Sequence, residues 1–504
     1  MDGTFGFQKR SSGVLLHLTS LPSGYGAGDL GEGAYGFADF LAAAGQRWWQ
    51  MLPITPSGGG DSPYSSYSAF AGNPWLISLD MLMEEGLLTK GDVQRAQSME
   101  RGKGTDVDFK AVTASRSEML RKAYAAFGEK KDRGLAMFCQ ENEGWLDDLA
   151  LYSALHDANG GKAWNEWERD LRLREPGAMK EAMQQYQAEV RFHRWMQYEF
   201  DRQWRRFRAH CHERGVELIG DLPIFVAYDS SDVWAHQELF RLDRQGRPTV
   251  LTGAPPDAFT ADGQLWGHPH YRWEAHRAEG YKWWGDRFTA MARRFDAVRI
   301  DHFLGFYRAW TVAADAKTAK EGKWTPGPRE EFFEAMRQRI GKFPVIAEDL
   351  GIVTPGAVTL REEFGFPGMR VLQMAFDRDH EMHRPHEYVR KCVAYTGTHD
   401  NHTAAGWFHS LDEEKKRMAL EYFGGTQATI SREMVRVVMT SVADTAIIPM
   451  QDWLGLGDEA RMNVPGVVGG NWGWRMEARE VTAALAAEMR QITEICGRSS
   501  DTRD

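Results

Sequence analysis

The sequence predicts a closed (β/α)8 barrel of the TIM type, with a large helical insertion and long loops over the C-terminal ends of its strands. Eight short apolar segments with a strand-like pattern are spread along the 504 residues. Helical patterns fill most of the gaps between them, as at 329–340. A charged, helix-periodic stretch at 80–212 interrupts the alternation. Three ordinary domains are the alternative for a chain of this length.

The expected strands follow one another at spacings that suit βα units. The first two, 13–18 and 48–54, flank a helical pattern and form a strand–helix–strand unit. Six further segments complete the barrel: 216–219, 297–300, 343–347, 369–374, 392–396 and 445–448. We therefore expect three parts: the start of the barrel (1–79), an inserted helical subdomain (80–212) and the remainder of the barrel (213–504).

Composition excludes several classes of partner. The formal net charge of -10 gives no electrostatic reason to approach nucleic acid or an anionic membrane. No run of about 18 apolar residues is present, and His17 and Thr19 interrupt the N-terminal apolar run too early for a signal peptide. The four cysteines lack CxxC spacing, which favours a reducing compartment. We expect a cytoplasmic monomer or weak homo-oligomer without a cofactor.

A glycine-rich segment, Gly26–Gly31, fits the GxGxxG spacing of dinucleotide-binding turns. Pro22 and Ser23 separate it from the preceding strand, whereas that fingerprint follows its strand immediately. Asp29 and Glu32 would repel a pyrophosphate. We interpret the segment as an ordinary glycine-rich loop, and a dinucleotide enzyme is only a third hypothesis.

Carboxylates follow three of the expected strands. Asp301 closes one strand beside Arg299, and Glu348 and Asp400 follow two others. In a parallel barrel these strand ends meet at one mouth, where barrel enzymes place their chemistry. An Arg–Asp pair that only braces a strand end is the alternative for Arg299 and Asp301.

Converging carboxylates repel one another, so they should differ in pKa. The carboxylate beside Arg299 should stay ionised, while a second one has its pKa raised. Glycoside cleavage with retention of the anomeric configuration needs two carboxyl groups that differ in this way. One acts as the nucleophile, and the other acts first as an acid and then as a base. The residues therefore indicate glycoside chemistry.

Metal binding is the rival use of such clusters. His380, His383 and His386 are three residues apart, but Pro385 breaks any helix that would align them, so a solvated loop is expected. The pair His399 and His402 lacks zinc-ligand spacing. We expect no metal site.

Several motifs resemble those of the α-amylase clan. They are Ala297–Phe303, which contains Arg-Ile-Asp-His, Ile346–Gly351, which contains Glu-Asp, and Thr398–Asn401. Four further segments are similar to one branch of the clan, the amylomaltases or 4-α-glucanotransferases (disproportionating enzymes) of glycoside hydrolase family 77: Asp61–Pro74, Gly253–Gly267, Asn463–Gly466 and Gly470–Arg475. The resemblance runs from about Gly13 to Arg475, nearly the whole chain.

The resemblance implies a role for each strand-end residue. Asp301 would be the nucleophile and Glu348 the general acid/base. Asp400 would bond the hydroxyls of the distorted sugar ring. Arg299 and His399 would flank the sugar at the cleavage point.

The resemblance also implies two walls for the substrate. The segment 253–268 would be a loop that covers the acceptor side, and Tyr64 would contact sugar from the opposite wall. The loop residues expected to touch glucan are Asp257, Phe259, Gln264 and Trp266. Three positions depart from the usual family pattern and bear on chain-length preference: Ala258, His268 and Val467.

The expected activity is the transfer of α-1,4-glucan segments to the 4-hydroxyl of another glucan or of glucose, by a retaining double displacement. The alternatives are a retaining α-1,4-glucan hydrolase and a non-catalytic glucan-binding protein on an inactive barrel. The presence of all three acids argues against the last. Malto-oligosaccharide products distinguish transfer from hydrolysis, because only transfer lengthens some chains.

Overall fold

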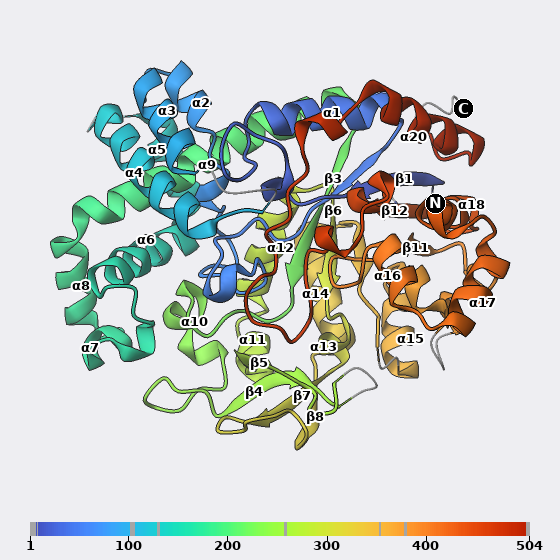
Figure 1. The fold of residues 1–504 in the computed structure, drawn as a ribbon. Helices are drawn as coiled ribbons and strands as arrows, with labels where there is room; N and C mark the ends of the chain where they lie inside the picture. The colour runs from blue at the N-terminus through green and yellow to red at the C-terminus, as the bar shows by residue number, and fades with distance from the viewer. Residues whose placement is uncertain are drawn as a thin grey trace.

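A computed structural model describes residues 7, 9–100, 106–128, 132–256, 260–351, 354–376 and 381–499. Within these residues, eight parallel strands close into a barrel in the order β1-β12-β11-β10-β9-β6-β3-β2 (Figure 1). They are β1 (Ser11–Leu15), β2 (Trp48–Gln50), β3 (Glu217–Pro223), β6 (Ala297–Asp301), β9 (Val345–Ala347), β10 (Gly368–Val371), β11 (Cys392–Tyr395) and β12 (Thr445–Pro449). All eight overlap the segments expected as strands, and the predicted fold class is confirmed.

Burial on both faces explains why the barrel strands are apolar runs in the sequence. Every residue of β1, β2, β9, β10, β11 and β12 is buried. Parallel strands need this pattern because helices cover one face and the barrel interior the other. In β6 only Asp301, the last residue, is partly exposed. The partly exposed residue of β6, Asp301, therefore lies at the mouth of the barrel.

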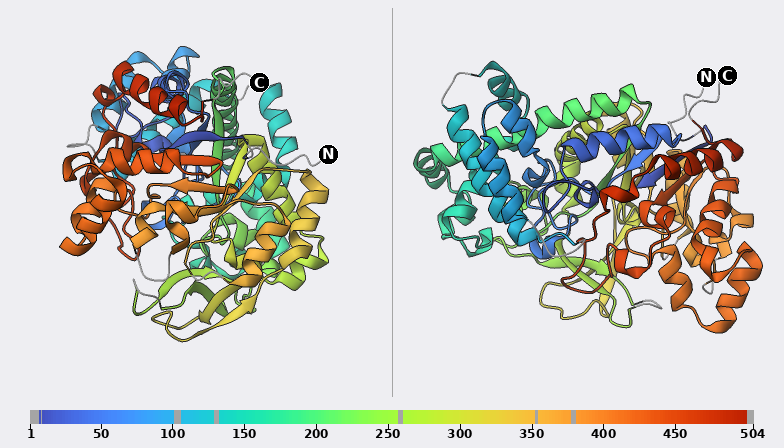
Figure 2. Two further views of the ribbon diagram at one scale, coloured as in Figure 1. Left: turned by 90° about the vertical axis from the view of Figure 1, so that its right-hand side faces the viewer. Right: turned by 45° about the horizontal axis from the view of Figure 1, so that its top comes forward.

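Helices follow the barrel strands and surround them (Figures 1 and 2). Outside the stretch between β2 and β3 they are α1 (Glu32–Ala43), α10 (Ser231–Ala235), α11 (Trp273–Ala278), α12 (Lys282–Arg294), α13 (Leu304–Tyr307), α14 (Arg329–Ile340), α15 (Pro355–Glu363), α16 (Ala404–Ser410), α17 (Glu413–Phe423), α18 (Ile430–Thr440), α19 (Met450–Leu454) and α20 (Ala483–Ile495). Among the described helices, none combines the length and the apolar character needed to span a bilayer.

The stretch between β2 and β3 is helical and lies to one side of the barrel (Figure 1). Its helices are α2 (Leu79–Glu84), α3 (Lys90–Met99), α4 (Phe109–Phe127), α5 (Arg133–Glu141), α6 (Glu143–Ala158), α7 (Arg169–Arg172), α8 (Pro176–Gln185) and α9 (Gln187–Glu213). The aromatic residues of α9, such as Trp195 and Trp204, are buried against neighbouring elements. The division of the chain into three parts stays a prediction.

A buried ionic cluster connects the glycine-rich segment near residue 26 to these helices. Arg116 of α4 forms ion pairs with Asp29 (3.0 Å) and Glu100 (3.1 Å), and all three side chains are almost fully buried. Gly26 donates its N–H to Glu100 (3.2 Å), and a Cβ at Gly26 would lie 2.4 Å from the Glu100 carbonyl oxygen. The segment thus packs against its own chain.

A second sheet stands at the C-terminal side of the barrel. In the part of the chain that is described, it has four antiparallel strands in the order β5-β4-β7-β8 (Figure 1). The strands are β4 (Val250–Ala254), β5 (Gln264–Pro269), β7 (Arg308–Ala313) and β8 (Gly322–Pro326). The segment 253–268, expected as a loop, contains the end of β4 and most of β5, which pair with each other in an antiparallel hairpin. Its residues 257–259 lie outside the described residues.

The barrel closes through a contact between segments near the two ends of the chain. β1 pairs in parallel with β12, so that Ser11 lies opposite Thr445. Arg498 is fully buried below this junction and donates hydrogen bonds to the carbonyl oxygens of Ser11 (2.9 Å), Ala443 (2.9 Å) and Met439 (2.7 Å). One guanidinium thus holds β1, the start of β12 and the end of α18 together.

Candidate active site

The three acids stand at strand ends on one side of the barrel, where β6 and β9 are neighbours and β10 separates β9 from β11. Asp301 ends β6, Glu348 directly follows β9, and Asp400 follows β11 in a short turn. Burial is the main cause that raises the pKa of Glu348, and the negative charge of Asp301 is the second. Burial also raises the pKa of the Tyr64 phenol, and the charges of Asp301 and Asp400 add to this effect. Asp301 therefore lies close both to Glu348 and to the Tyr64 phenol, which Asp400 also approaches.

Arg299 bridges two carboxylates at the centre of this site. Its Nη1 donates to Asp221 Oδ2 (2.7 Å) and its Nη2 to Asp301 Oδ1 (2.7 Å). Burial alone would lower the pKa of Arg299, but Asp221 and Asp301 outweigh it and raise that pKa well above its usual value. Arg299 thus carries a permanent positive charge against Asp301.

Asp221 is a site residue that the sequence predictions missed. It lies on β3 opposite Arg299, and its carboxylate also accepts a hydrogen bond from the Tyr64 hydroxyl (2.7 Å). Burial raises the pKa of Asp221, while the Arg299 charge acts in the opposite direction. The signal was present, because Asp221 lies just after the apolar run at 216–219.

Glu348 is held by backbone N–H groups. His302 N donates to its Oε2 (2.8 Å) and Leu350 N to its Oε1 (2.8 Å). Burial and the Asp301 charge raise the pKa of Glu348 to about 7, against the opposing effects of Arg299 and of both N–H groups. A carboxyl with this pKa can both give and take a proton near neutral pH.

Asp400 is fixed by residues from much later in the chain. Asn463 Nδ2 donates to its Oδ1 (2.6 Å), and Arg461 Nη2 donates to its backbone carbonyl oxygen (2.8 Å). His399 Nε2 lies 3.4 Å from its Oδ2. Neither Arg461 nor Asn463 was predicted, although Asn463 begins one of the motifs that carry the family resemblance.

Aromatic rings form one wall of the site. The rings of Tyr64 and His399 are stacked at 5.1 Å with an interplanar angle of 17°. The ring of Trp472 lies 5.8 Å from Tyr64 and 5.9 Å from His399. Such faces suit contact with sugar rings. The structure therefore brings the rings of Tyr64 and His399 together and adds Trp472, which was not predicted.

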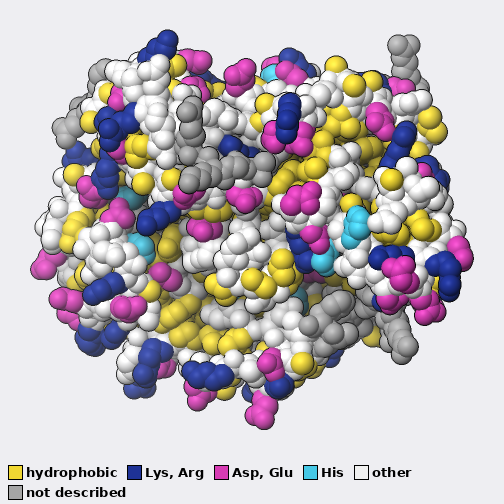
Figure 3. All heavy atoms as spheres, in the orientation of Figure 1, with side chains coloured by type: hydrophobic (Ala, Val, Ile, Leu, Met, Phe, Trp, Pro, Cys, Tyr) yellow, Lys and Arg dark blue, Asp and Glu magenta, His cyan; other side chains and the backbone are white. Residues whose placement is uncertain are grey.

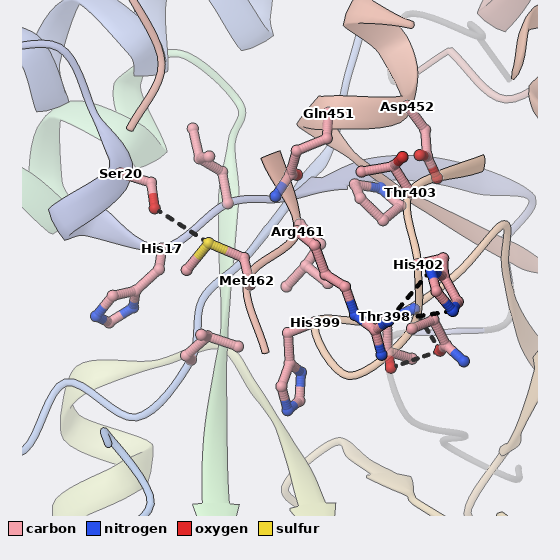
Figure 4. A pocket seen from close by; sticks show the side chains of 15 residues that line it. His17, Ser20, Thr398, His399, His402, Thr403, Gln451, Asp452, Arg461 and Met462 are labelled. Atoms are coloured by element: carbon pink, nitrogen blue, oxygen red, sulfur yellow. Dashed lines mark hydrogen bonds between the residues drawn. The ribbon is translucent and has the colours of Figure 1, made fainter. Parts of the chain in front are cut away.

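A pocket with about 420 Å³ of empty space, part of it open to solvent, borders this wall. Figure 4 shows His17 and His399 among the side chains that line it, with Met462 between Ser20 and Arg461. Burial is the main cause that lowers the pKa of His17 to about 3, so this imidazole stays neutral. The space-filling view also shows hydrophobic and histidine side chains together in the central part of one face (Figure 3).

The β4–β5 hairpin reaches the site through Trp266. The Trp266 ring meets the His302 ring edge-on at 4.8 Å, and its Nε1 donates to Gln264 Oε1 (3.2 Å). His302 directly follows Asp301, so Gln264 and Trp266 belong to the same site. The predicted contacts of Asp257 and Phe259 fall outside the described residues and stay predictions.

One predicted solvated histidine is buried instead. His383 is 2% exposed, and its Nδ1 accepts a hydrogen bond from Val371 N (3.0 Å). The expectation of a solvated loop is therefore wrong for His383: one ring nitrogen serves a buried backbone group at the end of β10. His386, by contrast, is exposed, and its Nδ1 lies 2.8 Å from the Tyr422 hydroxyl.

A possible metal cluster lies away from the barrel mouth. Over the described ranges, Asp157, Glu189 and His193 are the residues whose ligand atoms gather closely enough for an ion. Arg121 already pairs with Glu189 (2.8 Å) and lies 3.5 Å from Asp157. The Arg121 charge thus already pairs with two of the three candidate ligands.

Comparisons with known proteins agree with this geometry. The model of glycoside hydrolase family 77, described as 4-alpha-glucanotransferase, matches residues 16–482. A 4-alpha-glucanotransferase of Synechocystis sp. is 45% identical over 499 residues, which cover 97% of this chain and 98% of that protein. One from Thermus thermophilus is 43% identical over 502 residues, with coverages of 97% and 99%.

A solved structure gives the same relationship in three dimensions. The amylomaltase from Streptococcus agalactiae, in complex with acarbose, superimposes with a TM-score of 0.94 at 39% identity, and the match covers 98% of this chain and 100% of that one. Sequence, family model and fold thus agree over nearly the full length. The chain belongs to glycoside hydrolase family 77, the family of the 4-α-glucanotransferases.

Proposed function

We propose that Asp301 and Glu348 carry out the transfer of α-1,4-glucan segments to the 4-hydroxyl of another glucan or of glucose, with retention of configuration. The observation that supports this most is the contrast between the two carboxyl groups. Asp301 is bound to the cation of Arg299, whereas the pKa of Glu348 is raised to about 7. One group is thus suited to attack as an anion and the other to move a proton.

The first displacement forms a covalent intermediate. Asp301 Oδ1 is held by Arg299, so we assign the attack on the anomeric carbon to Oδ2. The glycosidic C–O bond breaks, and Glu348 gives its proton to the departing sugar oxygen. The Asp301 side chain is 30% exposed, which leaves it accessible to a glucan.

The second displacement returns the enzyme to its starting state. The 4-hydroxyl of an acceptor gives its proton to Glu348, and its oxygen attacks the anomeric carbon. The ester bond to Asp301 breaks and restores the carboxylate. The number of glycosidic bonds is unchanged, and the donor segment has moved to a new chain.

The remaining residues position the sugar. Asp400, fixed by Asn463, is placed to bond ring hydroxyls at the cleavage point. Tyr64 and His399 supply a stacked wall against which a sugar ring can lie. On the acceptor side we assign glucan contacts to Trp266 and Gln264, which favour a sugar over water by holding it in place.

Incubation with maltotriose tests the transfer. We expect glucose together with a ladder of longer oligosaccharides and no rise in total reducing ends. A rise in reducing ends with only shorter products would favour the alternative, a retaining hydrolase. Asp301→Asn and Glu348→Gln should each lower kcat by about 10²–10⁴-fold or more. Asp286→Asn, a surface carboxylate of α12 paired with Lys282, is the matched control and should leave the ladder unchanged.

Cytoplasmic location and a monomeric or weakly oligomeric state stay predictions. The four cysteines are free thiols, which supports a reducing compartment. Size-exclusion chromatography with light scattering would measure the mass of the protein in solution.

A further inference from the structure

His302 has an unusual backbone conformation at the centre of the site. It directly follows Asp301, and its φ of 52° lies in the left-handed region, which non-glycine residues rarely adopt. A residue in this region persists only where its surroundings hold it there, and such residues gather at functional sites.

The turn at His302 is built around Glu348. The backbone of Glu348 donates to Ile300 O (3.0 Å) and accepts from Phe303 N (3.1 Å), and its side chain accepts from His302 N (2.8 Å). The left-handed φ thus belongs to a turn that directs one N–H at a Glu348 carboxylate oxygen. The nucleophile precedes this turn and the acid/base receives its hydrogen bond.

The imidazole of His302 is packed on several sides. Its ring lies 4.8 Å from the Trp266 ring and 6.3 Å from the Phe225 ring. Gly305 lies beside the ring, because a Cβ added to it would come within 3.3 Å of His302 Cδ2. Its Nε2 is buried and has no hydrogen-bond partner among the residues described, so packing fixes the ring rather than a polar contact.

We propose that His302 is a positioning residue that links strand β5 to Glu348: the packing of its ring between Trp266 and Phe225 holds the left-handed backbone whose N–H orients the Glu348 carboxylate. An acceptor glucan that contacts Trp266 therefore acts, through His302, on the group that must deprotonate it. This proposal rests on the acid/base role proposed above for Glu348.

The charged groups around Glu348 set its pKa, and a change in that pKa is the measurable sign that His302 orients its carboxylate. Asp301 and Arg299 of β6 are the charged groups that act on it, while the neighbouring Asp349 forms an ion pair with Arg361 (2.6 Å). The His302 N–H lowers the pKa of Glu348, so its loss must raise that pKa further. The imidazole itself stays neutral, because burial lowers its pKa to about 4.

The test is the pH dependence of kcat/KM for maltotriose, whose alkaline limb reports the proton affinity of Glu348 in the free enzyme. His302→Val opposes the left-handed conformation, so the limb should move up by about one pH unit, a tenfold change in proton affinity. Asn adopts this conformation readily, so His302→Asn should keep the limb within about 0.3 units. Trp266→Ala should move the limb in the same direction as His302→Val.

Arg329 provides a matched control, since it also has a left-handed φ (55°) but is exposed at the start of α14. Arg329→Val should leave the limb in place. If His302→Val does not fold, the alkaline limbs of Trp266→Ala and His302→Asn still test the proposal. Equal losses of kcat/KM in all site variants, without movement of the limb, would show that His302 is only a packing residue. If Glu348→Gln keeps wild-type activity, the proposed function itself is wrong. If Glu348→Gln is inactive but the alkaline limbs of wild type, His302→Val and Trp266→Ala coincide, only the inference about His302 is wrong.

Discussion

Removal of the Asp221 carboxylate should weaken both the fold and the nucleophile. This carboxylate is buried and accepts two hydrogen bonds of 2.7 Å, one from Arg299 and one from Tyr64. Asp221→Ala leaves the buried Arg299 cation with Asp301 as its remaining carboxylate partner, and breaking such a pair costs about 3–5 kcal/mol of stability. Asp221→Asn keeps the shape and loses one charge-assisted bond, which costs about 1.5–3 kcal/mol.

The same change should reach the chemistry through Arg299. Without Asp221, the full positive charge of Arg299 faces Asp301, which stabilises that carboxylate and makes it a poorer nucleophile. If about 2 kcal/mol of this is felt at the transition state, kcat/KM falls about 30-fold. The direction does not depend on the magnitude: both variants are slower and less stable, and Asp221→Ala is the worse of the two.

Two measurements on the same preparations check this prediction. Urea unfolding gives the free energy of unfolding, and glucose release from maltotriose gives kcat/KM. Glu217→Gln is a suitable control, because Glu217 lies at the other end of β3 and its ion pair with Arg47 is partly exposed, worth about 1 kcal/mol or less. If Asp221→Ala unfolds at the wild-type urea concentration and keeps at least half of kcat/KM, the bridging role of Arg299 is wrong.

Three further outcomes follow from the contacts described above. The pKa of Glu348 is about 7 in the folded chain against an ordinary 4.5, so the folded state binds this proton more tightly than the unfolded state does. The folded state therefore loses about 3 kcal/mol of stability as pH rises from about 4.5 through 7. Glu348→Gln should therefore gain stability over the wild type at pH 8 but not at pH 4, and equal urea midpoints at pH 8 would contradict this. Asn463→Ala frees the Asp400 carboxylate, so kcat/KM for maltotriose should fall about tenfold while the urea midpoint changes little; unchanged kinetics would show that Asp400 needs no such support. Arg116→Leu strands two buried carboxylates and should cost about 3–5 kcal/mol in urea unfolding, and a loss below 1 kcal/mol would mean that they are neutral in the folded protein.

Burial decided which strands the sequence could predict. The barrel strands are covered on both faces, so they occur as apolar runs, and all eight were found. The second sheet was not expected, because strands such as β8 (Gly322–Pro326) are largely exposed and contain Lys323 and Thr325 among apolar residues. Their pairing is with β7, and it is visible only once the chain has folded back.

The site shows the same division between local and distant contacts. Asp301 and Glu348 could be found because each ends an apolar strand, and barrel topology alone then brings the strand ends together. Asn463 contacts Asp400 across 63 positions, and no spacing rule connects them. His383 was misjudged for a similar reason, since its buried partner, the N–H of Val371, belongs to a strand that precedes it.

The pairing of β1 with β12 has a consequence for how the chain is made. Ser11 and Thr445 are 434 positions apart, so the first strand of the barrel leaves the ribosome long before β12, one of its two neighbours, exists. Until then its edge is open to pairing with other chains, and contacts of such long range form slowly. A nascent chain therefore stays catalytically silent until almost all of it has been translated, and any factor that shields β1 during that interval would raise the yield of active enzyme.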